Sequence, residues 1–224
     1  VKEYKTFIKA PRSIGILKRV LGMGLVTNND IEFHKKQRKL AQPGFHFRRI
    51  QGFAETMVDY TDKVTSEWRD GEERDISDDM YKLTMYIVLK TLFDTDFEDV
   101  KEGADEIAHA IDIAQAVTIK RVRSLVQIPE WMPTKTNRMG QEATQTITRV
   151  IDGLIEQRRL PDGSYEDKGD LLSMLLLATY EDGSSMDRQQ LRDELVTLFV
   201  AGHETTSNAM TWCFYLVATH PDIQ

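Results

Sequence analysis

Apolar residues recur every three or four positions through most of the chain, which is the spacing of one face of an α-helix. A first stripe of this kind comprises Ile50, Phe53, Met57, Thr61, Val64 and Trp68. Ser77 is the predicted N-cap of a helix that continues to about Phe93, and the segment LTMYIVLKTLF within it is apolar on most sides. We therefore expect this helix to be buried among others. Ile76 is the one position interpreted as a short strand.

The rest of the chain continues the helical pattern. Further helices are predicted over residues 97–117, 139–159, 171–179 and 188–219. Asp187 is the expected N-cap of the last helix, and Pro221 closes it. An irregular, proline-containing connection over 121–135 separates two of the helices, and long loops of compact domains often carry function. The pattern predicts a mainly α protein.

Composition narrows the class of protein. Of the 224 residues, 41% are apolar and 29% are charged, as in globular domains. The 36 acidic residues exceed the 29 basic ones, and a net charge of −7 disfavours a nucleic-acid binder. One cysteine cannot form an internal disulfide, and no apolar stretch is long enough to span a bilayer. The opening residues VKEYKTFIKAPRS lack the apolar core of a signal peptide, so we expect a soluble, cytoplasmic protein.

Positive charge is concentrated between Ile31 and Arg49. This segment holds Lys35, Lys36, Arg38, Lys39, Arg48 and Arg49 against a single acid, Glu32. Two interpretations stay open for the patch. It is either an ordinary solvated helix face or a surface that attracts an acidic partner protein.

The last predicted helix narrows to small side chains along one face. That face comprises Leu198, Ala201, Thr205 and Ala209. Gly202 stands beside it in mid-helix, where glycine costs about 1 kcal/mol relative to alanine. Glu204 and Thr205 place an acid and an alcohol at the same level, and a buried carboxylate is costly unless it is paired. These residues are poor choices for an ordinary core helix, which indicates that a bulky group approaches the backbone here.

Two segments resemble the cytochrome P-450 family, the haem-thiolate monooxygenases. Residues 201–206, AGHETT, are similar to the oxygen-activation motif in the family's long central helix. Residues 24–50, GLVTNNDIEFHKKQRKLAQPGFHFRRI, resemble the segment around its haem-propionate helix. His34 and Arg38 occupy the two propionate-binding positions, and histidine at the first is found in many bacterial members. The order and separation of the two segments also match, so the resemblance covers essentially the whole chain.

The resemblance implies the fold, the cofactor and the site. Residues 1–224 would form a partial haem-thiolate monooxygenase domain, roughly helices C to I of the cytochrome P-450 fold, incomplete at both ends. Haem b would be the cofactor of the complete protein. Thr205 would hydrogen-bond the bound oxygen, and Glu204 would connect it to a proton path. The cofactor-binding residues implied are His34, Arg38, Phe45, Ala201, Gly202 and Thr206, and the residues lining the substrate pocket are Leu25, Val26 and Leu198.

The implied reaction is insertion of one atom of O2 into a small hydrophobic substrate. Electrons would come from NAD(P)H through a separate ferredoxin or reductase, since the chain has no glycine-rich dinucleotide-binding turn. The donor protein would dock near Lys35, Lys36 and Lys39. No nucleic acid is expected as a partner.

The chain departs from the family where the iron ligand is expected. The family's cysteine stands in the pattern Phe-x-x-Gly-x-x-x-Cys-x-Gly, whereas Cys213 has Thr206, Ala209 and Tyr215 at the three marker positions. We therefore interpret Cys213 as a small core thiol and expect the axial cysteine outside this chain. Residues 156–159 have the spacing of the family's Glu-x-x-Arg pair but precede the oxygen motif, so an exposed ion pair is the better interpretation.

Other classes of protein fit the sequence less well. His203-Glu204 could begin a zinc-protease motif, but Ser207 stands where the second histidine is required. A non-catalytic, all-α ligand-binding or interaction protein of the same fold stays open if the chain truly ends at Gln224, because it would then have no thiolate ligand. An unrelated α-helical regulator is disfavoured by the two matching segments. Since the chain begins at Val1 without a methionine, we interpret it as a fragment. Because the axial cysteine is not among its residues, we expect that the fragment does not bind haem catalytically by itself.

Overall fold

The computed structural model describes residues 9–95, 97–126 and 128–223, with the side chains of 97–105 left aside. This part of the chain is helical and has two isolated β-bridges in place of strands, which confirms the expectation of a mainly α fold. Residues 1–8, on which part of the signal-peptide argument rests, lie outside the described part. The elements are α1 (Pro11–Leu21), α2 (Ile31–Ala41), η1 (Gln42–Phe45), α3 (Phe47–Ser66), α4 (Ile76–Phe93), α5 (Phe97–Arg123), α6 (Lys135–Gln157), α7 (Leu171–Leu177) and α8 (Arg188–Thr219).

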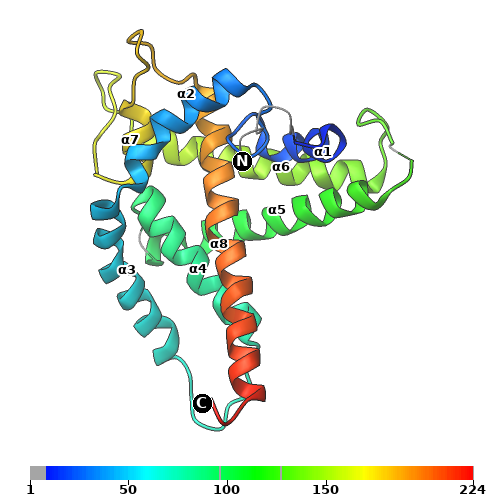
Figure 1. Cartoon of the computed structure of the whole chain (residues 1–224), viewed down its shortest axis with the longest axis vertical. Helices are drawn as coiled ribbons and strands as arrows, with labels where there is room; N and C mark the ends of the chain where they lie inside the picture. The colour runs from blue at the N-terminus through cyan, green and yellow to red at the C-terminus, as the bar shows by residue number, and fades with distance from the viewer. Residues whose placement is uncertain (1–8, 96, 127, 224) are drawn as a thin grey trace, which may run out of the picture.

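The long helix α8 forms the axis of the molecule (Figure 1). Helix α4 packs along it, α5 crosses it, and α6 runs antiparallel to α5. The core lies between α4 and α8, where Met80 and Leu83 are buried together with Leu195. The rings of Phe93 and Phe199 lie 6.3 Å apart across the same interface. The prediction that α4 is buried among other helices is therefore confirmed.

The start of α4 differs from the prediction. Ile76 is the first residue of the helix rather than a short strand, and Ser77 is not its N-cap. The N-cap is Asp75, whose carboxylate accepts a hydrogen bond from the Ser77 backbone N–H at 2.9 Å. Aspartate and serine are both favoured at this position, and Asp75 precedes Ser77 in the chain, so the helix starts earlier.

Helix α3 buries apolar side chains along only part of its length. Tyr60 and Val64, in its C-terminal half, are buried, whereas Ile50 and Met57 are more than 40% exposed. Trp68 lies beyond the end of the helix and packs its ring edge-to-face against Phe214 of α8, with 6.3 Å between centroids. The predicted stripe therefore faces the core only in part.

The last helix follows its predicted limits, whereas α6 begins four residues before the predicted position 139 and ends at Gln157. The Asp187 carboxylate accepts from the Gln190 backbone N–H at 2.8 Å and caps α8, as expected, and α8 ends at Thr219. Helix α7 is short and buried, also as expected. Helix α5 continues past residue 117 to Arg123. Among the described residues, no helix combines the length and the apolar character needed to cross a membrane.

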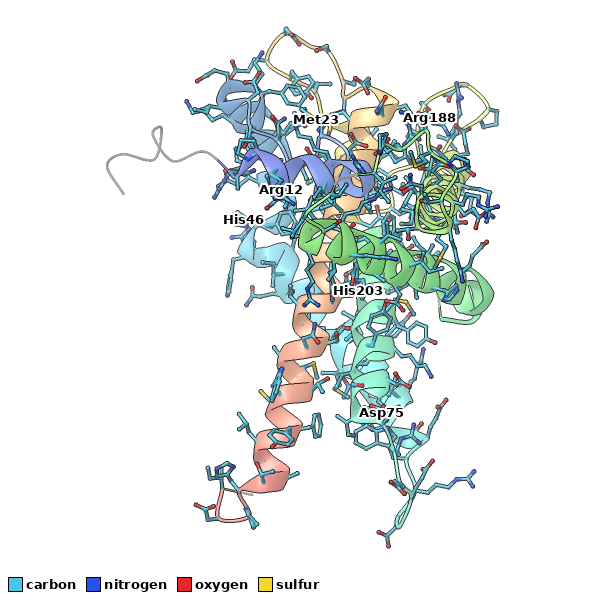
Figure 2. The ribbon with its side chains drawn as sticks, turned by 90° about the vertical axis from the view of Figure 1, so that its right-hand side faces the viewer. Arg12, Met23, His46, Asp75, Arg188 and His203 are labelled. Carbon is cyan, nitrogen blue, oxygen red and sulfur yellow. The ribbon has the colours of Figure 1, made fainter. Side chains whose placement is uncertain are left out.

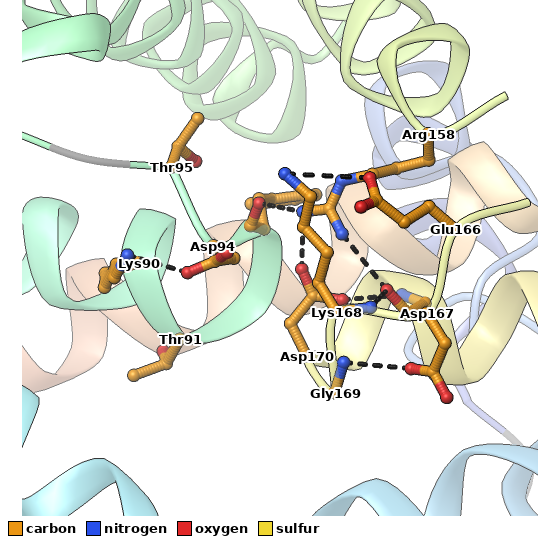
Figure 3. Close-up of polar contacts among 12 residues, drawn as sticks. Lys90, Thr91, Asp94, Thr95, Arg158, Glu166, Asp167, Lys168, Gly169 and Asp170 are labelled. Atoms are coloured by element: carbon orange, nitrogen blue, oxygen red, sulfur yellow. Dashed lines mark hydrogen bonds and ion pairs between the residues drawn. The ribbon is translucent and has the colours of Figure 1, made fainter. Parts of the chain in front are cut away.

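A buried ion pair joins the ends of α4, α6 and α7 (Figure 3). Arg158, which follows α6, contacts the Asp170 carboxylate at 2.6 Å, and both side chains are buried. The same guanidinium donates to Ser173 Oγ at 3.1 Å and to the Phe93 carbonyl. Asp170 also caps α7 by accepting from the Ser173 backbone N–H at 2.7 Å. Charges satisfied in this way are tolerated in a core, whereas an unpaired buried charge is costly.

Cys213 is exposed on α8, so its interpretation as a core thiol is wrong. The reason is that the C-terminal half of α8 projects beyond most of the other helices, as Figure 1 shows, and Trp212 and Tyr215 beside it are exposed as well. The pair Glu156–Arg159 behaves as expected. Its nitrogen and oxygen lie 3.8 Å apart and both side chains are exposed.

Candidate functional site

Residues 201–206 lie in the middle of α8, close to where α5 crosses it (Figure 2). The helix has two different faces at this level. The open face comprises Ala201, Thr205 and Ala209, which are exposed, and is continued by the half-buried Leu198. His203 and Ser207 are buried on the other side. The small-residue face predicted from the sequence therefore exists, and in the described part of the chain it is open.

The acid and the alcohol are anchored separately. Glu204 is half-buried, and its Oε2 accepts a hydrogen bond from Gln115 Nε2 of α5 at 2.8 Å. Thr205 is exposed, and its hydroxyl donates to the Ala201 carbonyl at 2.8 Å. A hydroxyl that donates in this way still has lone pairs with which to accept a hydrogen bond. The arrangement therefore presents an acceptor on the open face and a carboxylate held toward α5.

Gly202 allows α4 and α8 to pack closely. A Cβ at this position would come within 3.1 Å of Val88 Cγ2 on α4. This contact accounts for a mid-helix glycine that is otherwise about 1 kcal/mol less favourable than alanine. Thr206 is exposed and donates its hydroxyl hydrogen to the Gly202 carbonyl at 3.0 Å. The roles of Gly202 and Thr206 toward a cofactor stay predictions.

His203 is a candidate that the sequence analysis considered only as a zinc ligand. Its side chain is completely buried, and its Nδ1 lies 2.9 Å from the Phe199 carbonyl oxygen. Its ring packs edge-to-face against Tyr81 of α4, with 5.1 Å between centroids. Burial lowers the pKa of His203, although the bond to Phe199 and the charges of Glu204 and Asp112 oppose this shift. The sequence did offer one signal of this burial. His203 is one helical turn after the apolar Phe199, so the two side chains share a face of α8.

The loop between α1 and α2 is fixed onto the first turns of α8. The backbone N–H of Met23 donates to Asp193 Oδ2 at 2.7 Å, and that of Leu25 donates to Glu194 Oε2 at 3.0 Å. Burial raises the pKa of both carboxyls, because a charged form is less well solvated there. These bonds determine where the loop lies relative to α8.

This anchoring brings the predicted substrate-lining residues to one region. Leu25 is half-buried, Val26 is exposed, and Leu198 lies one turn after Glu194 on α8. Gly24 permits the close approach, since a Cβ there would lie 2.7 Å from the carbonyl oxygen of Asp193. Contact of these side chains with a substrate stays a prediction.

The predicted propionate-binding residues lie one turn apart on α2. His34 is half-buried and Arg38 is exposed. The pKa of His34 is lowered by burial and then by the positive charges of Lys9 and Arg38, with no carboxylate of the described residues acting against them. Lys9, which the sequence analysis missed, donates to the carbonyls of Leu25 and Asn28 at 2.9 and 3.0 Å. A cluster of donors without an anion of its own fits a group that carries carboxylates.

Phe45 is the last residue of η1, directly after α2, and its side chain is about half exposed. This position leaves the ring free to contact a further group. Its packing near haem stays a prediction.

The basic patch on α2 is partly neutralised within the chain. Lys39 pairs with Glu181 at 2.5 Å, and Lys35 pairs with Glu32 at 3.0 Å. The bond from Lys39 and, more weakly, the charge of Lys36 lower the pKa of Glu181. Helix α2 and the connection before α8 enclose a surface cleft of about 570 Å³ here. Docking of an electron donor at Lys35, Lys36 and Lys39 stays a prediction.

Comparison with known proteins identifies the family. The cytochrome P-450 family profile matches residues 2–224, and the chain belongs to this family of haem-thiolate enzymes. A cyclooctat-9-en-7-ol 5-monooxygenase of Streptomyces melanosporofaciens is 34% identical over 92% of this chain and 44% of its own length. The pentalenene oxygenase of Streptomyces avermitilis is 26% identical, with the same coverage of both chains. The crystal structure of the cytochrome P450DA heme domain matches with a TM-score of 0.80 at 25% identity, over 97% of this chain and 47% of that one.

These matches confirm the predicted family and fold class. The chain spans slightly less than half the length of the relatives that it matches. It therefore represents part of the cytochrome P-450 fold. That residues 201–206 of α8 form the oxygen-activation motif stays a prediction.

Proposed function

We propose that these residues belong to a haem-dependent monooxygenase that inserts one oxygen atom from O2 into a small hydrophobic substrate. The observation that carries this proposal is the Glu204–Thr205 pair, with its hydroxyl on the open small-residue face of α8 in a member of this family. Haem b, when bound through a cysteine thiolate, supplies the iron chemistry that activates oxygen. The residues of this chain contribute binding, space and proton handling.

His34 and Arg38 would hold the carboxylates of the cofactor. With its lowered pKa, His34 is neutral at pH 7 and acts as a hydrogen-bond donor, while Arg38 supplies the positive charge. Ala201 keeps side-chain volume low on the open face of α8, one turn before Thr205. Thr205 accepts a hydrogen bond on the open face, and Glu204 holds the proton to be passed in that direction.

We propose that the substrate is hydrophobic, because Leu25, Val26 and Leu198 offer it apolar side chains. The names of two relatives specify cyclooctat-9-en-7-ol and pentalenene, and these compounds are the first candidates to test. Electrons would come from NAD(P)H through a ferredoxin or reductase that docks near Lys36. The single cysteine is consistent with a cytoplasmic location, where NAD(P)H and the electron-donor protein would both be present.

The test is made on the complete protein, expressed from the source gene. We expect its reduced, carbon-monoxide-bound absorption spectrum to show thiolate-ligated haem. Incubation with NADPH, a ferredoxin system, isotopically labelled O2 and each of the two candidate compounds should give a product carrying one labelled oxygen atom. A complete protein without haem would contradict the proposal and favour the non-catalytic ligand-binding alternative.

A further inference from the structure

Five polar side chains meet where α4, α5 and α8 come together. They are Tyr81, Asp112, Gln115, His203 and Glu204. Tyr81 Oη donates to Asp112 Oδ1 at 3.0 Å, and Gln115 Nε2 donates to Glu204 Oε2 at 2.8 Å. His203 contacts one of these pairs directly, because its ring packs edge-to-face on Tyr81, and it is the residue before Glu204 in α8. Figure 2 shows His203 at this crossing.

One ring nitrogen of His203 has no hydrogen-bond partner in the part of the chain that the structure describes. Nδ1 lies 2.9 Å from a carbonyl oxygen, which can only accept, so Nδ1 carries the proton and Nε2 is an acceptor. The side chain is 0% exposed, and Nε2 has no hydrogen-bond partner among the described residues. An unpaired buried acceptor costs about 1–3 kcal/mol. Buried water molecules satisfy groups of this kind and usually bridge several polar atoms.

We propose that a water molecule bound to His203 Nε2 completes a proton relay that runs from Asp112 through Tyr81 to Glu204. The proposal rests on the proposed function, because the relay serves the Glu204–Thr205 pair. Asp112 is exposed on α5, so the relay begins at solvent, and it ends at the half-buried Glu204. Burial raises the pKa of Tyr81, and the charges of Asp112 and Glu204 add to this rise, so the phenol keeps its proton at neutral pH.

The proton balance closes at every step. When Glu204 releases its proton toward the open face of α8, its carboxylate takes a proton from the bound water. Asp112, protonated from solvent, then donates to Tyr81 Oη, and the Tyr81 hydroxyl turns to donate its hydrogen to the water. His203 stays neutral, because burial lowers its pKa, and it acts as a positioning residue that holds the water.

A crystal structure of the complete, haem-containing protein tests the water site directly. We expect a water molecule within hydrogen-bonding distance of His203 Nε2. A dry Nε2, or one that bonds a protein group instead, overturns the proposal. This result does not depend on activity, so it decides the water site even if the protein is not a monooxygenase.

The variant Tyr81→Phe tests conduction through the relay, because it keeps the ring contact with His203 and removes only the hydroxyl. Tyr165→Phe, in the hairpin after α6, is the matched control. With NADPH and a ferredoxin system but no substrate, O2 goes either to water, using two NADPH, or to hydrogen peroxide, using one. The amount of NADPH consumed per O2 therefore reports proton delivery. We expect the peroxide share to rise several-fold in Tyr81→Phe and to stay at the wild-type value in Tyr165→Phe.

Asp112→Asn separates conduction from structure. The amide oxygen still accepts from Tyr81, but the side chain no longer takes up a proton from solvent. We expect the same rise in peroxide with an unchanged midpoint of thermal unfolding. Wild-type peroxide in both variants overturns the relay. A wild-type protein that consumes no O2 overturns the proposed function instead, and the crystal structure then decides the water site.

Discussion

Glu204 and Thr205 are neighbours in the chain, but α8 directs them to different surroundings. Glu204 bonds to Gln115 of α5, whereas Thr205 bonds to Ala201 of its own helix and lies on the open face. The motif in the sequence identified both residues. It did not predict Gln115, which is 89 positions earlier, because a partner from another helix depends on how the helices cross. His203 was missed for the same reason, since its burial depends on α4 and α5.

Thr205→Ala tests the role of the hydroxyl. In the complete protein, we expect NADPH consumption to continue while product formation per NADPH falls several-fold, because an acceptor on the open face is lost. The free energy of unfolding should change by less than about 0.5 kcal/mol, as is usual for an exposed position. Thr219→Ala removes an equivalent bond to a carbonyl one turn earlier and is the control. Unchanged coupling in Thr205→Ala would contradict the proton-handling role.

Arg38→Ala tests the assignment of the haem carboxylates. Loss of a hydrogen bond to a charged group costs about 1.5–3 kcal/mol, so we expect haem to bind about 10- to 100-fold more weakly. The measurement is transfer of haem from the complete protein to an excess of an apo-globin acceptor. Arg48→Ala removes another exposed cation, next to η1, and should retain haem normally. If Arg38→Ala also retains haem normally, the assignment is wrong.

At the scale of secondary structure, local signals predicted the helices well and their surroundings less well. The Asp187 cap and the limits of α8 follow from residues close in sequence, and both were predicted correctly. The predicted start of α4 was wrong, because Asp75 rather than Ser77 takes the N-cap position. Periodicity also identified the apolar stripe of α3, but it does not say which turns another helix covers. The buried pair of Arg158 and Asp170 had no local signal, since it joins separate helix ends.

Asp170→Asn tests that buried pair. Asparagine keeps an oxygen that caps α7 but removes the charge opposite Arg158, so we expect a loss of about 3–5 kcal/mol in unfolding free energy. Asp170→Ala also removes the cap and should cost about 1 kcal/mol more. Urea unfolding of each variant gives these values. Asp167→Asn, at an exposed neighbouring position, is the control, and an equal effect there would show that the pair is not responsible (Figure 3).

Gly24→Ala tests the attachment of the loop before α2 to α8. The added Cβ would lie 2.7 Å from a backbone carbonyl oxygen of α8, which cannot move aside easily. We expect destabilisation of about 1–3 kcal/mol. Gly153→Ala, inside α6, meets no atom within 4 Å and should instead stabilise the protein by about 1 kcal/mol. Similar effects of the two substitutions on the urea midpoint would contradict the close approach.

At the scale of the whole molecule, the pattern of residues specified mainly helices, and the resemblance to a family specified how they are arranged. Helix periodicity alone does not determine that α4, rather than α3, lies along α8. The exposed C-terminal half of α8 shows the same limit. Cys213 was expected in a core because it does not fit the family's cysteine pattern, but it is exposed, as is its neighbour Trp212. Burial depends on how the helices pack together, so the sequence of one helix does not predict it.

The stability of the whole molecule should depend on pH through two histidines. His34 and His203 have a lowered pKa in the folded state, below the ordinary value of 6.5. Between the lowered pKa and 6.5, the unfolded chain binds protons that the folded chain does not, so unfolding free energy falls as the pH falls below 6.5. Each histidine contributes at most about 1.4 kcal/mol per pH unit. Asp193 and Glu194, whose pKa values are raised by burial, act in the opposite sense at more acidic pH.

Urea unfolding of the haem-free protein at a series of pH values checks this expectation. We expect the unfolding free energy to be nearly constant above pH 7 as far as these two histidines are concerned, and to decrease below 6.5. His203→Gln should flatten the decrease, because it removes the fully buried group, and His34→Gln should flatten it less, because that side chain is only half-buried. His220→Gln, at the exposed end of α8, controls for the substitution itself. If the unfolding free energy of His203→Gln falls with pH as steeply as that of the wild type, burial does not hold His203 neutral. Its Nε2 would then not be an acceptor for the proposed water.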